Sequence, residues 1–172
     1  MNVFVTGFGP FLGNDDNPSA ALAESCGLPF RVLPVTFRAV EEFLASALEF
    51  DALLMLGLAS GEQDPRLRLE MVARNVIGAT PDAEGVVAGP GPIAPFASRQ
   101  LGATLFRTRE LVADSARWRP SVDAGSYLCN YSLFRALMTW PGRAVGFVHV
   151  PPVEVMPLEA QRAALADVIA HI

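Results

Sequence analysis

The 172-residue chain contains no lysine, and all 13 of its basic side chains are arginines. The absence of lysine excludes Schiff-base and pyridoxal chemistry, and also a P-loop that binds phosphate through its lysine. Hydrophobic residues make up 51% of the chain and charged residues 18%, a balance that excludes a disordered chain. Because the net charge is −5, a nucleic-acid-binding surface is not expected either.

No hydrophobic run approaches the ~20 residues that a helix needs to cross a bilayer, so a membrane protein is not expected. The opening residues, MNVFVTGFG, lack the basic region and the apolar stretch of a secretory signal. The sequence therefore favours a cytoplasmic location. Its length favours one domain, residues 1–172, with a large buried core.

Cysteine and histidine are scarce, with two of each. No CxxC, HxH or HExxH spacing is present, so a zinc site is not expected. Cys26 ends an apolar helical stretch and is expected to be a small core residue, while His171 lies next to the chain terminus. Cys129 and His149 remain as the candidate thiol–imidazole pair, with reduced thiols expected in the cytoplasm.

Strand-like and helix-like hydrophobic patterns alternate along the chain. This alternation predicts an α/β fold, a single-domain three-layer α/β/α sandwich with a mostly parallel, twisted central sheet. The helix at 19–26 is expected to begin at Asn17-Pro18, a capping residue followed by proline. The expected strands are 2–7, 31–37, 51–59, 67–78 and 144–151, the expected helices are 19–26, 39–50, 103–118, 129–140 and 158–172, and the expected long loops are 7–16 and 79–100.

Cys129 follows a Gly-Ser-Tyr-Leu turn and begins a predicted helix. The free N–H groups and the dipole at a helix start favour a thiolate and can also bind an oxyanion. A buried structural thiol is the alternative interpretation. His149 lies near the end of a predicted strand, where ligands bind in open α/β sheets. Its alternative is a core histidine bonded to a carbonyl.

Glu70 lies in a segment with strand-like alternation, on the same face as Arg66, Arg68 and Arg74. One interpretation is a solvated charged face on which Glu70 pairs with arginines. The other is a carboxylate that orients His149 and stabilises its imidazolium. Periodicity does not decide between them.

Seven ordered motifs span nearly the whole chain: VTGFGPFLGNDDNPS (5–19), LPVTF (33–37), LMLGLASG (54–61), LEMVARNV (69–76), PDAEG (81–85), DAGSYLCNYSLFRAL (123–137) and VGFVHVPPV (145–153). Together they resemble type I pyroglutamyl peptidases, cytosolic cysteine peptidases that remove an amino-terminal pyroglutamyl residue. The resemblance implies an α/β/α sandwich and a catalytic triad of Glu70, Cys129 and His149. It implies substrates that are peptides with an amino-terminal pyroglutamate, and no metal or organic cofactor.

The resemblance also implies an apolar slot for the pyrrolidone ring. The residues expected to line this slot are Phe8, Phe11, Tyr127 and Leu128, and backbone groups around Leu58 are expected to bind the lactam N–H and C=O. The family commonly has Gln at the position of Leu58 and Arg at those of Glu62 and Met71, so this chain departs from the pattern near the expected slot. Members are often dimers or tetramers, and the sequence leaves a monomer and a homo-oligomer open.

Two alternatives accompany this interpretation. A class I glutamine amidotransferase also uses Cys, His and Glu, but there the last two usually stand as HxE, whereas Glu154 follows His149 at a longer spacing here. The other is a catalytically weakened pyroglutamyl-binding protein of the same fold, with the altered segment 58–68 as the cause. The sequence leaves this second alternative open.

Overall fold

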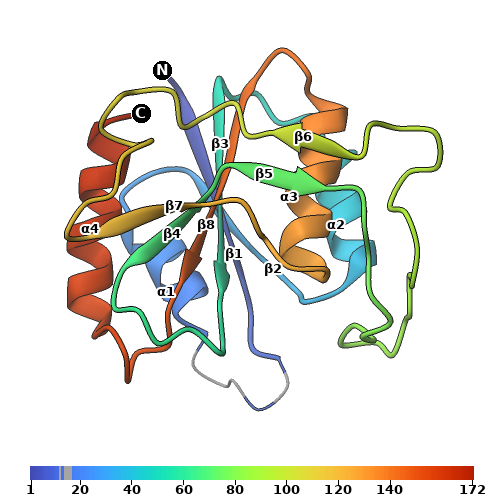
Figure 1. The fold of residues 1–172 in the computed structure, drawn as a ribbon, viewed down its shortest axis with the longest axis horizontal. Coiled ribbons are helices and arrows are strands. Elements are labelled where there is room, and N and C mark those ends of the chain that lie inside the picture. Colours follow the sequence, from blue (N-terminus) through green and yellow to red (C-terminus); the bar gives the residue numbers. More distant parts are fainter. Residues whose placement is uncertain (12, 14–16) are drawn as a thin grey trace.

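The computed structural model describes residues 1–11, 13 and 17–172, so residues 12 and 14–16 of the loop expected at 7–16 lie outside the described residues. The described part contains a six-stranded sheet of order β2-β1-β3-β8-β4-β7 and a two-stranded sheet, β5-β6 (Figure 1). The strands are β1 (Val3–Phe8), β2 (Phe30–Leu33), β3 (Ala52–Leu58), β4 (Leu67–Glu70), β5 (Val72–Arg74), β6 (Gln100–Gly102), β7 (Trp118–Ser121) and β8 (Ala144–Val150). The helices are α1 (Pro18–Ser25), α2 (Phe37–Leu44), α3 (Leu128–Thr139) and α4 (Leu158–Ala170).

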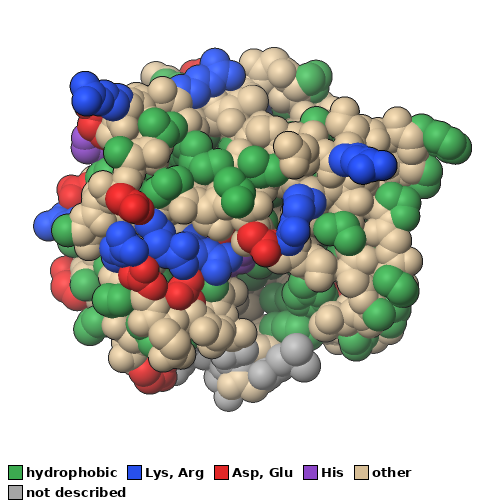
Figure 2. Space-filling model, in the orientation of Figure 1, with side chains coloured by type: hydrophobic (Ala, Val, Ile, Leu, Met, Phe, Trp, Pro, Cys, Tyr) green, Lys and Arg blue, Asp and Glu red, His purple; other side chains and the backbone are tan. Residues whose placement is uncertain are grey.

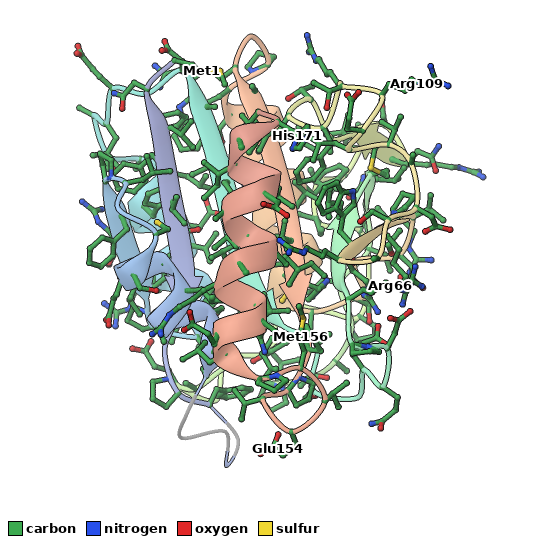
Figure 3. The ribbon with its side chains drawn as sticks, turned by 90° about the vertical axis from the view of Figure 1, so that its left-hand side faces the viewer. Met1, Arg66, Arg109, Glu154, Met156 and His171 are labelled. Atoms are coloured by element: carbon green, nitrogen blue, oxygen red, sulfur yellow. The ribbon has the colours of Figure 1, made fainter. Side chains whose placement is uncertain are left out.

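The six-stranded sheet is parallel except where β4 runs antiparallel to β8. Helices α1 and α4 cover one face of it, and α2 and α3 cover the other (Figure 1). In the side view, α4 lies in front of the sheet and runs roughly along its strands, between the labelled Met156 and His171 (Figure 3). Each helix pair encloses its own buried hydrophobic cluster against the sheet. The predicted α/β class and mostly parallel sheet are confirmed.

Local sequence explains where the first elements begin and end. The Asn17 side chain accepts a hydrogen bond from the Ser19 N–H and caps α1, as its sequence context predicted. Gly7 allows α1 to approach β1, because a Cβ there would lie 2.3 Å from the Ser19 carbonyl oxygen. Strand β2 ends at Leu33, short of the predicted 31–37, and Thr36 caps α2 instead.

Two predicted elements were wrong. Residues 67–78 do not form one strand: the chain leaves the large sheet after Glu70, and Val72 begins β5 in the small sheet. Residues 103–118 are not helical, because Leu105, Phe106 and Leu111 are buried against the sheet by an irregular segment. Tertiary packing outweighs helical periodicity in this segment. No helix among the described residues has the length and hydrophobicity to cross a bilayer.

Candidate active site

The three residues predicted to act together come from three elements of the sheet and its helical cover. Strand register places His149 of β8 beside Gly57 of β3 on one side and Arg68 of β4 on the other. Directly paired residues of antiparallel strands share a face, so Arg68 and His149 point to the same side of the sheet. Alternation along β4 gives Glu70 the same orientation. Helix α3, which carries Cys129, covers this side.

Glu70 and His149 form a buried pair. The Nδ1 atom of His149 lies 2.7 Å from Oε1 of Glu70, and the two side chains are 6% and 0% exposed. Of the two interpretations of Glu70, the solvated face is therefore wrong. Its pairing with arginine does occur, because Arg68 donates to the same Oε1 from Nε at 3.0 Å and from Nη2 at 2.9 Å.

The imidazole of His149 is poised to carry a proton. Burial on its own lowers the pKa of His149, but the charge and hydrogen bond of Cys129, followed by those of Glu70, outweigh burial and raise this pKa from 6.5 to about 9. Because the Nδ1–H group donates to Glu70, Nε2 is the ring nitrogen left to exchange a proton with the thiol. This geometry suits general acid–base chemistry.

Cys129 is the second residue of α3, and its thiol is free and half-buried. Tyr127, which precedes the helix, makes no side-chain cap, so backbone N–H groups at this helix start are available to an anion. The sulfur sits directly over β3: a Cβ built on Gly57 would lie 2.9 Å from Sγ of Cys129 and 2.6 Å from the Phe147 ring. Gly57 thus leaves room for the sulfur beside the sheet.

We expect Gly57→Ala to lower kcat by about 10²-fold, because the new methyl group displaces the Cys129 sulfur from the ring of His149. Steady-state kinetics on a pyroglutamyl amide, the substrate class that the sequence resemblance implies, measure this effect. Gly61→Ala is the matched control, since Gly61 borders the same cleft and a Cβ there meets nothing within 4 Å. Equal kcat values for the two variants would contradict this account of Gly57.

Two cavities meet at Cys129. The larger is an open cleft of about 560 Å³, and the smaller is a pocket of about 220 Å³. They share Leu58, Ser60, Tyr127 and Cys129. The smaller pocket is lined by the four residues expected in the apolar slot, Phe8, Phe11, Tyr127 and Leu128, and also by Leu58. The sulfur therefore lies where an apolar pocket opens into a wider cleft.

The wall of the slot is built from stacked rings and backbone contacts. The rings of Phe11 and Tyr127 stack with their centroids 5.8 Å apart, and the Tyr127 hydroxyl donates to the Pro81 carbonyl at 3.0 Å. Of the loop 79–100, Thr80 reaches the slot lining. Asn17 also lines the slot, but its amide is engaged with Gly9 and Ser19. These contacts are those of a structural residue.

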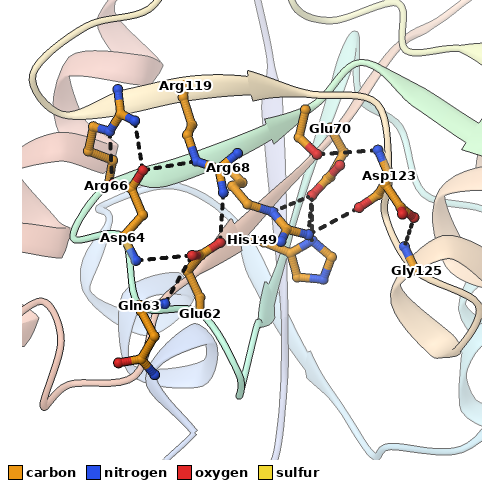
Figure 4. A network of polar contacts seen from close by, with 11 residues as sticks. Glu62, Gln63, Asp64, Arg66, Arg68, Glu70, Arg119, Asp123, Gly125 and His149 are labelled. Atoms are coloured by element: carbon orange, nitrogen blue, oxygen red, sulfur yellow. Dashed lines mark hydrogen bonds and ion pairs between the residues drawn. The ribbon is translucent and has the colours of Figure 1, made fainter.

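An ion-pair cluster borders the larger cleft (Figure 4). Glu62 accepts hydrogen bonds from Arg68 at 3.3 Å and from Arg119 at 2.9 Å. Arg66 instead pairs with Asp64 at 2.6 Å. Blue and red side chains accordingly gather over β4 and β7, beside a hollow in the surface (Figure 2). Sequence reasoning missed this cluster, although alternation placed Arg66 and Arg68 on one face.

No group of three or more potential metal ligands of the His, Cys, Asp and Glu types occurs in the part of the chain that the structure describes. The site brings together a thiol, an imidazole and a carboxylate in contact, an uncapped helix start, and an apolar pocket. Such an arrangement can transfer an acyl group through a covalent intermediate.

Comparisons of the sequence and of the structure with known proteins all point to one family. A family model for pyroglutamyl peptidase matches residues 1–164. The pyrrolidone-carboxylate peptidase of Thermococcus kodakarensis is 35% identical, with 96% of this chain and 88% of that protein covered. The pyrrolidone carboxyl peptidase structure from Thermus thermophilus is 35% identical with a TM-score of 0.78, covering 99% of this chain and 100% of the other. That from Thermococcus litoralis has a TM-score of 0.83 at 28% identity, covering 98% and 91%.

Proposed function

The chain belongs to the pyroglutamyl peptidase family, and on that premise we propose that it hydrolyses the bond after an amino-terminal pyroglutamyl residue. Cys129 is the proposed nucleophile, His149 the general acid and base, and Glu70 the residue that orients His149. The observation that carries the proposal is the position of Cys129: its sulfur lies beside a His149 held by Glu70, where the apolar pocket meets the cleft.

In the first half of the reaction, the thiolate of Cys129 attacks the carbonyl carbon of the pyroglutamyl residue. A sulfur–carbon bond forms, and the N–H groups at the start of α3 bind the oxygen on which negative charge develops. The carbon–nitrogen bond then breaks, while the imidazolium of His149 gives its proton to the leaving amine. The products of this half are a pyroglutamyl thioester on Cys129 and a peptide shortened by one residue.

In the second half, His149 takes a proton from a water molecule as that water attacks the thioester. The sulfur–carbon bond breaks, free pyroglutamate leaves, and the thiolate and imidazolium are restored. Throughout both halves, Glu70 holds the Nδ1–H side of the ring, so that Nε2 faces the reacting atoms. All proton transfers are made by the chain's own residues.

The smaller pocket accounts for the choice of substrate. A pyroglutamyl ring is a lactam without an α-ammonium group, so it can enter a pocket lined by Phe8, Phe11 and Leu128 without burying a charge. A free amino-terminal Gln or Glu would have to shed water from its ammonium, which costs several kcal/mol. We propose that backbone groups near Leu58, at the end of β3, bind the lactam amide.

We expect kcat/KM for a pyroglutamyl amide to exceed that for the matching glutaminyl amide by at least about 10³-fold, because of this desolvation cost. Release of a fluorescent amine from both compounds measures the ratio, and pre-treatment with iodoacetamide should abolish release. Absence of any iodoacetamide-sensitive release would refute the proposed function. Tight binding of pyroglutamate without turnover would support the weakened binding protein instead.

We further propose that residues 1–172 act as one domain. The lining of the two cavities draws on segments from Phe8 to His149, and α4 packs on the sheet after them. We also propose a cytoplasmic location, in line with the family and the reduced thiol that this chemistry requires.

A further inference from the structure

Arg68 contacts both partners of the buried pair. Its Nε and Nη2 atoms lie 3.0 Å and 2.9 Å from Oε1 of Glu70, and Nη2 lies 3.4 Å from Nδ1 of His149. Oε1 thus receives donors from two side chains, while Oε2 is buried without a hydrogen-bond partner among the described residues. The carboxylate is shared between a permanent cation and a titratable one (Figure 4).

We propose that Arg68 is a positioning residue of the catalytic site, which holds Glu70 in place and allows His149 to release and regain its proton. The inference rests on the proposed function, because it assigns Arg68 a part in the proton cycle of that reaction. Arg68 does not need to touch the substrate for this part, since it acts through Glu70 and His149.

The physical argument starts from the burial of Glu70, which is fully enclosed. If His149 were the only partner of that carboxylate, each loss of the imidazole proton would leave a buried charge unpaired, which is strongly unfavourable. The guanidinium of Arg68 balances Glu70 whether His149 is charged or neutral, because arginine keeps its proton at all relevant pH values. Arg68 therefore lowers the cost of making His149 neutral.

Arg68 is itself held in position by contacts with other residues. Its side chain is 21% exposed, with Nη1 at 3.3 Å from Glu62 and Nη2 at 3.1 Å from the carbonyl oxygen of Asp123. Burial opposes the charge of Arg68, but Glu70 and Glu62 outweigh it and raise the pKa of the guanidinium. Glu62 is fixed in turn by Arg119 and by the N–H groups of its following residues.

The charges that face His149 can be assigned element by element. Strand β4 contributes Glu70 and Arg68, helix α3 contributes Cys129, and β3 contributes only Gly57 in register with the ring. The loop before α3 contributes Asp123, whose carboxylate pairs with Arg74. Among these described groups, Arg68 is the cation in contact with the imidazole. Removal of Arg68 should therefore raise the pKa of His149.

The test compares Arg68→Gln, which removes the charge but keeps a donor for Glu70, with Arg68→Lys, which keeps the charge. The chain has two histidines, so ring NMR signals during a pH titration are assigned with one His171→Asn variant. We expect His149 in Arg68→Gln to titrate about one pH unit higher than in the wild type, because an opposing cation has gone. Arg68→Lys should titrate near the wild type.

Arg119→Gln is the positional control, since Arg119 borders the same cleft but pairs with Glu62 and Asp64. We expect it to leave the titration of His149 within a fraction of a unit of the wild type, and the alkaline limb of kcat/KM should move upward only in Arg68→Gln. An unchanged titration in Arg68→Gln, or an equal change in Arg68→Lys, would overturn the inference. The NMR titration needs no turnover, so it distinguishes this failure from a failure of the proposed function.

Discussion

Cys129→Ala is expected to lower kcat for a pyroglutamyl amide by at least about 10⁴-fold, as removal of a nucleophile from a coupled triad does elsewhere. The reason is that the proposed thioester cannot form without the sulfur, and neither cavity offers a second thiol at the junction. The fold should persist, because alanine is smaller than the half-buried cysteine that it replaces. Amine release and circular dichroism measure the two effects.

Cys26→Ala is the matched control for this prediction. Cys26 follows α1, its thiol lies 3.0 Å from the Ala23 carbonyl, and it packs in the cluster on the other face of the sheet. We expect this variant to keep most of the wild-type activity. If Cys26→Ala folds but is inactive while Cys129→Ala is active, then Cys26 is the nucleophile and the proposal for Cys129 is wrong.

His149→Ala is expected to have the second-largest effect, also about 10⁴-fold or more in kcat, because His149 is the residue proposed to carry the proton to and from Cys129. Glu70→Gln should cost less, about 10²- to 10³-fold, since it disturbs the orientation of the ring but leaves the imidazole in place. The amide oxygen can still accept from Arg68 and from Nδ1–H, as Oε1 of Glu70 does, but it carries no negative charge to stabilise the imidazolium. Steady-state kinetics of both variants at the same pH measure which of the two loses more of its kcat.

His171→Ala is the control for the histidine variants. His171 Nδ1 lies 2.7 Å from the Asp167 carbonyl at the end of α4, and its ring is 5.9 Å from that of Trp118. We expect wild-type kcat from this variant. Wild-type activity in Glu70→Gln would leave Glu70 as a partner of Arg68 alone, without a part in catalysis.

Much of this fold could be predicted from the sequence because its central strands and its caps carry local signals. The apolar run before Leu58 became β3, and the cap at Asn17 began α1 as expected. The helix predicted at 103–118 was wrong, because contact with Gly146 of β8 determines which residues of this segment are buried. A Cβ at Gly146 would lie 2.8 Å from the Phe106 ring. No periodicity within the segment reports that contact.

The charged surroundings of the site could not be predicted for a related reason. Alternation gave Arg68 and Glu70 a shared face, but it could not show that β4 pairs antiparallel with β8 and presses this face onto His149. That pairing is long-range information. It decides between a solvated ion pair and a buried carboxylate shared by two donors.

Glu62 shows how the structure changes the meaning of a sequence difference. The resemblance implies arginine at this position, which suggests a substitution toward the family residue. Yet the Glu62 side chain is 12% exposed and pairs with both Arg68 and Arg119. An arginine there would bring three guanidinium groups together, so the negative charge of Glu62 is needed between its two arginine partners.

The central claim is that Cys129 carries the pyroglutamyl group during the reaction. An activated pyroglutamyl ester makes acylation fast, so acid quenching during turnover, followed by peptide mass spectrometry, measures the acyl group directly. The account predicts a pyroglutamyl group on the peptide that contains Cys129, and none on the peptide that contains Cys26. Turnover of the ester at an undiminished rate by Cys129→Ala, with the acyl group absent from position 129 in the wild type, would contradict it.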